Sequence, residues 1–186
     1  PFFMEHNGAK GIHINYKSAQ VDQVYFPQIE VVGDIALSVD ALADALGSKL
    51  DLDLRDFEKV RDNVKREIYR LDDEPSFPMR PQHIVSEIRN LMGYHDIIAL
   101  DNGVYKIWFA RNYLAFQPNT ILLDNALATM GAGLPSAMLA AMIHPNRKVM
   151  SICGDGGFMM NSQELETAVR LDLNLVVLIL NDSSYG

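Results

Sequence analysis

Residues 149–157 have the sequence Val-Met-Ser-Ile-Cys-Gly-Asp-Gly-Gly, a short apolar run that ends in a glycine-rich turn. A second apolar run at residues 175–180 is followed by Asn181 and Asp182. In an open parallel sheet, ligands bind at the carboxyl ends of such strands. We therefore expect Asp155 and Asp182 to lie side by side there. Two hard oxygen ligands suit Mg²⁺, which uses one or two carboxylates and completes its octahedron with water and phosphate oxygens.

The glycines of this turn point to a phosphate. Gly154, Gly156 and Gly157 allow the backbone to approach an anion closely. A helix that we expect to begin near Ser162 would direct its free amides the same way. The turn therefore predicts a clamp for Mg²⁺ and a diphosphate. The alternative is an ordinary turn in which Asp155 only caps a helix.

Helices and strands alternate around this turn. The sequence patterns predict helices at residues 82–92, 103–114, 134–142 and 162–171, and strands at residues 97–101, 121–124, 149–153 and 175–180. Alternation of this kind is typical of an α/β fold with a parallel, doubly wound sheet. The loops after three of the strands should gather at one edge of the sheet.

The upstream sequence predicts a second α/β piece and a linker. Strands at residues 11–16 and 31–34 and a helix at residues 37–46 place the tail of a Rossmann-like domain at residues 1–48. Apolar residues spaced by threes and fours predict an amphipathic surface helix at residues 54–71. Prolines then break the chain, so we assign residues 49–80 to a helical linker and residues 81–186 to the sheet domain, truncated at its C-terminal end. We interpret the chain as an internal fragment of a longer polypeptide.

Composition narrows the class of protein. The formal net charge of −8 argues against a nucleic-acid-binding surface, for which a basic footprint is expected. The single cysteine, Cys153, excludes an internal disulfide and favours a core thiol in a reducing compartment. No apolar run approaches the roughly 20 residues that cross a membrane, and no signal-peptide pattern is present. We therefore expect a cytoplasmic protein.

Residues 161–164 have two interpretations. In the first, Asn161 is the N-cap of a helix and Glu164 reaches back to it in a variant of the capping box. In the second, Glu164 is a catalytic acid. The cap accounts fully for the position of Glu164, so we favour the structural interpretation.

The motifs taken together resemble a known family. The matching stretches are residues 101–103 (Asp-Asn-Gly), 107–111 (Ile-Trp-Phe-Ala-Arg), 129–135 (Thr-Met-Gly-Ala-Gly-Leu-Pro), 154–158 (Gly-Asp-Gly-Gly-Phe) and 164–169 (Glu-Leu-Glu-Thr-Ala-Val). They are similar to the diphosphate domain of thiamine diphosphate (ThDP) enzymes and, within these, to the acetolactate synthase group, closest to its catabolic branch. Residues 1–48 resemble the end of the central domain of that group.

The resemblance implies roles for particular residues. The side chains of Asp155 and Asp182 and the carbonyl of Ser184 would hold Mg²⁺. The cofactor-binding positions implied by the family are Asn102, Gly103, Val104, Tyr105, Ala128, Met130, Gly156 and Gly157. Among these, the Ala128 carbonyl would accept from the 4′-amino group and Met130 would separate the two rings of the cofactor. Met130 as core filler is the alternative.

The chain departs from the family pattern in three places. Residues 124–128 (Asp-Asn-Ala-Leu-Ala) replace a serine- and glycine-containing loop, Asn181-Asp182 replaces Asn-Asn, and Val104-Tyr105 replaces Gln-His. The cofactor-activating glutamate of the family lies in an N-terminal domain, and no glutamate here matches it. The resemblance therefore assigns no catalytic residue to this chain.

The resemblance also implies an activity. The parent protein would use ThDP and Mg²⁺ to decarboxylate a 2-oxo acid and ligate the product, most simply two pyruvates to 2-acetolactate and CO₂. It would be a homodimer or homotetramer, and the fragment alone would be inactive. FAD is left open, and no residue pattern supports it. The alternatives are another ThDP lyase, decarboxylase or oxidase, or a non-catalytic nucleotide-binding module, which the lack of Gly-x-Gly-x-x-Gly disfavours.

Overall fold

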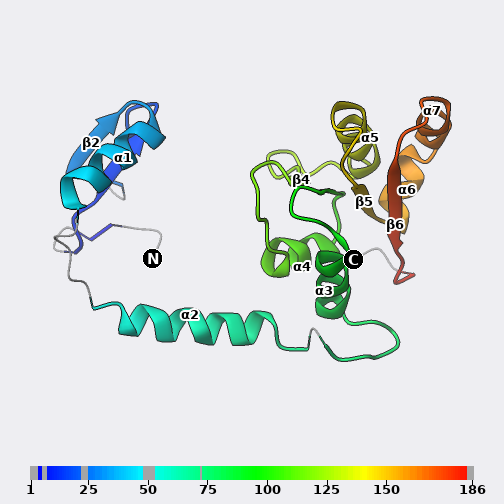
Figure 1. The fold of residues 1–186 in the computed structure, drawn as a ribbon, viewed down its shortest axis with the longest axis horizontal. Helices are drawn as coiled ribbons and strands as arrows, with labels where there is room; N and C mark the ends of the chain where they lie inside the picture. Colours follow the sequence, from blue (N-terminus) through cyan, green and yellow to red (C-terminus); the bar gives the residue numbers. More distant parts are fainter. Residues whose placement is uncertain (1–3, 6–7, 22–24, 48–52, 72, 184–186) are drawn as a thin grey trace. The chain divides into compact units, whose positions relative to one another are not determined.

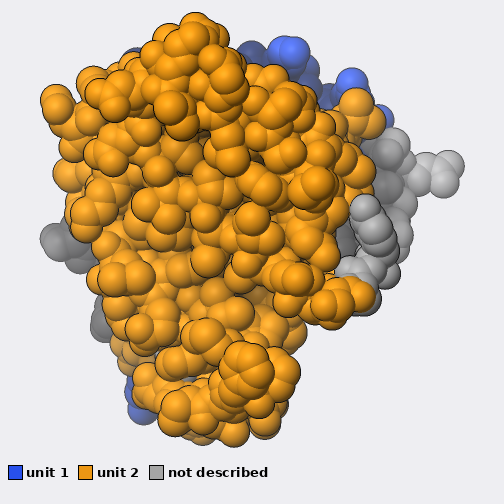
Figure 2. Space-filling model, turned by 90° about the vertical axis from the view of Figure 1, so that its right-hand side faces the viewer, with its two compact units in different colours: residues 1–56 blue, residues 57–186 orange. Residues whose placement is uncertain are grey.

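The computed structural model describes residues 4–5, 8–21, 25–47, 53–71 and 73–183. The chain forms two compact units, residues 1–56 and residues 57–186, which Figure 2 colours separately. Every buried hydrophobic residue among the described ones belongs to the second unit. No helix in the described ranges is both long enough and apolar enough to cross a membrane.

The first unit contains two parallel strands and a helix. Strand β1 (Ile12–Asn15) pairs in parallel with β2 (Ile29–Val32), and α1 (Ile35–Leu46) follows. Asp34 is the N-cap of α1, and its carboxylate accepts a hydrogen bond from the Leu37 amide at 2.9 Å. This bond lowers the pKa of Asp34. The second strand thus ends two residues earlier than predicted, because Asp34 begins the helix instead.

Helix α2 (Arg55–Ile68) is the predicted amphipathic helix, and the unit boundary falls at its start. It ends three residues early, and Leu71 adopts a positive φ of 72°. The apolar stripe formed by Phe57, Val60 and Val64 is exposed.

A four-stranded parallel sheet forms the centre of the second unit. Its strands are β3 (Ile97–Leu100), β4 (Ile121–Leu123), β5 (Val149–Gly154) and β6 (Leu175–Leu180), in the order β4-β3-β5-β6. Strand β3 is buried along its whole length. Continuous apolar runs are typical of parallel strands covered on both faces.

Helices cover both faces of this sheet, which confirms the predicted α/β fold (Figure 1). They are α3 (Pro81–Leu91), α4 (Tyr105–Asn112), α5 (Gly133–Ile143), α6 (Asp155–Asn161) and α7 (Glu164–Arg170). Alternate strand residues face opposite layers. Ile98 and Leu100 join the cluster with α3 and α4, whereas Ile97 and Ala99 pack on α5.

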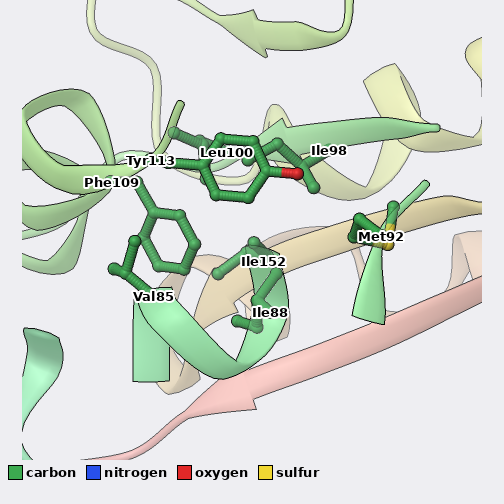
Figure 3. Packing of buried hydrophobic residues seen from close by; sticks show 8 residues of the cluster. All are labelled: Val85, Ile88, Met92, Ile98, Leu100, Phe109, Tyr113 and Ile152. Carbon is green, nitrogen blue, oxygen red and sulfur yellow. The ribbon is translucent and has the colours of Figure 1, made fainter. Parts of the chain in front are cut away.

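The cluster under α3 and α4 anchors the strand ends. Figure 3 shows Val85 and Ile88 of α3 gathered with Phe109 of α4 and Ile152 of β5 in one cluster. Phe109 and Ile152 are almost completely buried, and full burial of such side chains contributes about 1.5–3 kcal/mol each. This packing gives the loops after β3 and β5 a rigid base.

The helix predicted at residues 162–171 forms as α7, two residues shorter at its start, but the helix that precedes it, α6, was not predicted. Helix α6 begins at Asp155, directly after β5, and ends at Asn161; α7 then begins at Glu164. The capping box is also absent from this described segment, since Gln163 precedes α7 without a side-chain cap. The Asn161 amide donates instead to the Gly131 carbonyl at 2.7 Å. A tertiary hydrogen bond has therefore taken the side chain that local sequence assigned to a cap.

Candidate functional site

The strand order creates a natural binding edge between β3 and β5. From β3 the chain passes to β4 on one side, and β5 then returns to pair with the other side of β3. The loops that leave β3 and β5 therefore separate toward opposite faces of the sheet. Such a switch point is where ligands bind in open α/β sheets.

A cavity of about 680 Å³ lies at this edge. It is lined by Asn102, Gly103, Val104, Tyr105, Trp108 and Phe109 after β3, by Met130, by residues 154–157 after β5, by residues 179–183 at the end of β6, and by Phe77, Pro78, Met79, Pro81 and Ile84. The three loops that the sequence predicted to converge thus contribute to one cavity. The last group lies largely in the predicted linker, and sequence patterns gave no signal for it.

The two candidate metal ligands line this cavity. Gly154 of β5 pairs with Leu180 of β6, so Asp155 and Asp182 follow one and two residues after neighbouring strand positions. Asp155 also accepts a hydrogen bond from the Gly156 amide at 2.8 Å. The third predicted ligand, Ser184, lies outside the described residues.

The donor set suits a hard cation of low protein coordination. No group of three or more histidine, cysteine or acidic side chains gathers for a metal within the described ranges. A site with only two carboxylates leaves the remaining positions to water and ligand oxygens, as Mg²⁺ requires. Two carboxylates on one cavity wall are compatible with a cation of this kind.

Tyr105 packs tightly between two of the loops. A Cβ atom at Gly103 would lie 2.5 Å from Tyr105 Cε1, and one at Gly154 would lie 3.2 Å from it. The hydroxyl is buried without a well-formed hydrogen bond to the described residues. Burial raises the pKa of Tyr105, and the nearby Gly154 amide opposes this with a smaller lowering effect. The phenol thus stays neutral and shapes the wall of the cavity.

The predicted cofactor positions fall into two groups. Gly156, Gly157, Met130 and residues 102–105 line the cavity, whereas Ala128 is exposed in the loop that follows β4 and does not. The Asn102 side chain is already engaged: its amide donates to the Thr129 carbonyl at 2.6 Å, and its oxygen accepts from Lys106 Nζ at 2.6 Å. Asn102 thereby supports the loop as well as lining the cavity.

Two residues near the site had been given no role from the sequence. Asp101, at the exit of β3, is completely buried and accepts backbone hydrogen bonds from two loops. Lys106 donates to the Asp124 carbonyl as well as to Asn102. An acidic residue directly after a buried strand was the available signal for Asp101. Lys106 gave none, because the carbonyl that it holds, that of Asp124, lies 18 residues further along the chain.

The structure also bears on the alternative roles considered for Glu164 and Cys153. Glu164 is the first residue of α7 and is not part of the cavity wall. Cys153 is fully buried, and burial raises the pKa of its thiol, which confirms the predicted core role.

Several known proteins are similar to this chain in sequence. The family model described as thiamine pyrophosphate enzyme, C-terminal TPP binding domain, matches residues 101–186. An acetolactate synthase of Bacillus subtilis (strain 168) is 34% identical over 191 residues, which cover 100% of this chain and 33% of that protein. A catabolic acetolactate synthase of Raoultella terrigena is 35% identical over 181 residues, which cover 94% of this chain and 32% of that protein.

An archaeal relative extends the comparison. A probable acetolactate synthase large subunit of Methanocaldococcus jannaschii is 32% identical over 188 residues, with 96% of this chain and 31% of that protein covered. The chain thus spans about one third of the length of these curated relatives. Residues 101–186, which build the sheet edge and most of the cavity wall, therefore belong to the family of C-terminal TPP-binding domains of thiamine pyrophosphate enzymes, as their motifs predicted.

Proposed function

We propose that residues 101–186 form the Mg²⁺- and diphosphate-binding half of a ThDP site in an enzyme that acts on 2-oxo acids. The main support is that Asp155 and Asp182, from neighbouring strands, line the same cavity as the turn at residues 154–157. Relatives named acetolactate synthase support a more specific reaction. In it, the full-length protein would convert two pyruvates to 2-acetolactate and CO₂.

Each part of the cavity would have a distinct task. The carboxylates of Asp155 and Asp182, together with the Ser184 carbonyl, would hold Mg²⁺, while backbone amides at Gly156 and Gly157 would contact the diphosphate. Met130, which lines the cavity, would orient the ring system. Bound ThDP supplies the electron sink for decarboxylation. The protein contributes binding, orientation and exclusion of water.

We expect this chain alone to have no catalytic activity. Proton transfer to the cofactor requires an acid or base within hydrogen-bond reach of its ring. The acidic residues of the described wall, Asp155 and Asp182, are the proposed metal ligands, and no glutamate belongs to it. A second chain segment would have to supply that group, consistent with a cofactor bound between the subunits of a homodimer or homotetramer.

Calorimetric titration of the full-length protein with ThDP tests this proposal. Binding is expected with Mg²⁺ and should be lost when EDTA removes the metal. Asp155→Asn and Asp182→Ala should each weaken ThDP binding at least about tenfold, since the first removes a charged ligand and the second removes the ligand oxygens at its position. Asp172→Asn is the matched control, because Asp172 is exposed and has a positive φ of 51° that asparagine tolerates.

Three outcomes would contradict the proposal. They are ThDP binding that ignores Mg²⁺, full affinity in Asp155→Asn, and binding of NAD in place of ThDP, which would favour the nucleotide-binding alternative. If ThDP binds as expected, formation of acetolactate from pyruvate by the full-length protein tests the specific reaction.

A further inference from the structure

Asp101 is a buried acidic residue where three segments of the chain meet. Its side chain is 0% exposed and lies behind the cavity wall. An acidic side chain taken out of water is costly unless hydrogen bonds satisfy its oxygens. Here the Asn102 amide donates to Oδ1 at 2.8 Å, and the Gly131 amide donates to Oδ1 at 2.8 Å and to Oδ2 at 3.0 Å.

The bond to Gly131 fixes the residue next to Met130. Gly131 has a φ of 87°, a conformation that glycine adopts without strain. The Asn161 amide holds the other side of the same residue, since it donates to the Gly131 carbonyl at 2.7 Å. Gly131 is therefore held through both its amide and its carbonyl, by side chains from the exit of β3 and the end of α6. Because Gly131 is the next residue along the chain, the backbone of Met130 is held in place as well.

The same carboxyl group contacts the first turn of α6. A Cβ atom at Gly157 would lie 2.0 Å from Asp101 Oδ2, so the two groups already touch. Asp155 begins this helix and Asn161 ends it. Asp101 is thus in contact both with the helix that carries a candidate metal ligand and with the loop that carries Met130.

Side chains just after Asp101 hold the other part of that loop. The side-chain amide of Asn102 donates to the Thr129 carbonyl at 2.6 Å, and Lys106 Nζ donates to the Asp124 carbonyl. The loop of residues 124–131 contains no helix or strand of its own. Its position therefore depends on side chains from the exit of β3.

We propose that Asp101 is a positioning residue that fixes Met130 relative to the metal-binding end of the cavity, without touching the cofactor itself. This inference rests on the proposed function. It predicts that Asp101 matters for the ring portion of ThDP, which Met130 would orient, and much less for the diphosphate portion, which the turn at residues 154–157 would hold.

Inorganic pyrophosphate separates the two portions, because it shares the diphosphate but lacks the rings. The experiment compares the calorimetric affinity of the full-length protein for ThDP and for pyrophosphate, each with Mg²⁺, before and after Asp101→Ala. Loss of the hydrogen bonds to Gly131 should weaken ThDP binding about tenfold while pyrophosphate affinity stays within about twofold. Asp101→Asn, which retains one acceptor oxygen, should recover part of the ThDP affinity.

Ser151→Ala is the control, because Ser151 is equally buried in β5 and its hydroxyl contacts Cys153 rather than the loop. It should leave both affinities unchanged. If Asp101→Ala does not fold, Asn161→Ala removes the opposite hydrogen bond to Gly131 and should give the same selective loss, smaller in size.

Equal weakening of ThDP and pyrophosphate, or no change in either, would overturn the positioning role. A wild-type protein that binds neither ligand would instead overturn the proposed function, so the two failures are distinguishable.

Discussion

The exits of β5 and β4 reach the same cavity by different physical means. At the β5 exit, residues 154–157, a helix begins at once, and Asp155 accepts from the adjacent Gly156 amide. At the β4 exit, residues 124–131, no helix or strand forms, and side chains of Asp101, Asn102, Lys106 and Asn161 hold the backbone. One exit is determined locally and the other by distant residues.

This difference explains which part of the site can be found in a sequence. A local turn carries its own signature, because the residues that shape it are consecutive. A loop held by distant partners can carry a family motif, as residues 129–131 do, but its own sequence does not reveal what holds it. Ordering each of its residues costs about 1–2 kcal/mol of conformational entropy. The β4 exit should therefore be the part of the site most easily loosened by substitutions elsewhere in the chain.

The largest expected effect is at the point where the two exits meet. Gly157→Ala would place a Cβ atom 2.0 Å from Asp101 Oδ2, and neither the helix start nor the buried carboxyl group can easily move. We expect a loss of about 3 kcal/mol in the free energy of unfolding, measured by urea denaturation. Gly93→Ala is the control, because its nearest neighbour is the end of the Asp96 side chain at 3.0 Å. Equal stability of the two variants would show that the exits are not rigidly joined.

A smaller, selective effect is expected at the β4 exit. Lys106→Met keeps the length of the side chain but removes its hydrogen bonds to Asn102 and the Asp124 carbonyl. We expect the free energy of unfolding to fall by about 1–2 kcal/mol. Hydrogen exchange should accelerate at the amides of residues 125–131 and stay unchanged at residues 154–157.

Lys148→Met is the matched control for this comparison. Lys148 is exposed, and its amine donates a long hydrogen bond, 3.4 Å, to the Leu91 carbonyl. Faster exchange at both exits in Lys106→Met would mean that they open together, which would contradict a β5 exit that is held only by its own residues.

The smallest expected effect concerns Tyr105, whose ring lies against the exits of β3 and β5. Tyr105→Phe removes a buried hydroxyl that lacks a well-formed hydrogen bond, so stability at neutral pH should be unchanged or higher by about 1 kcal/mol. Burial raises the pKa of Tyr105 in the folded state, so the native state favours the neutral phenol. The contribution of the neutral Tyr105 phenol to the free energy of unfolding is complete below the unfolded pKa of about 10. It is lost as the pH rises through the higher pKa of the folded state.

The thermal midpoint followed from neutral to alkaline pH measures this contribution. The wild type should lose stability above about pH 10 more steeply than Tyr105→Phe. Tyr94→Phe serves as control because Tyr94 is exposed, and it should follow the wild type. Identical alkaline profiles for all three proteins would show that Tyr105 is not held in its neutral form.

Much of the second unit could be predicted because its signals are local. Strand β6 matches its predicted range, and β5 extends only one residue beyond its own, since continuous apolar runs bounded by polar residues define both. The parallel order and the convergence of loops followed from helix–strand alternation. The start of α6 could not be predicted, because glycines in its first turn resemble a loop although the Asp155 backbone is already helical.

The remainder of the site depends on tertiary partners. Nothing adjacent to Asp101 in sequence reveals that it meets Gly131 and Gly157, which lie 30 and more residues away. Asn161 fits a helix cap by local rules and is drawn instead to Gly131. In the first unit, the predicted strands and helix form, but nothing described there is buried enough to be called a core. The assignment of residues 1–48 to a central domain stays a prediction.

The charge balance of the cavity wall has a thermodynamic consequence. Its described residues include the acidic Asp155 and Asp182 but no lysine, arginine or histidine, and Lys106 directs its amine onto the Asp124 carbonyl instead. A polyanion entering alone would meet these two carboxylates, whereas a divalent cation bound to them reverses the sign of the local field. Anion and cation should therefore bind with strong positive heterotropic coupling, each raising the affinity of the other by the same factor.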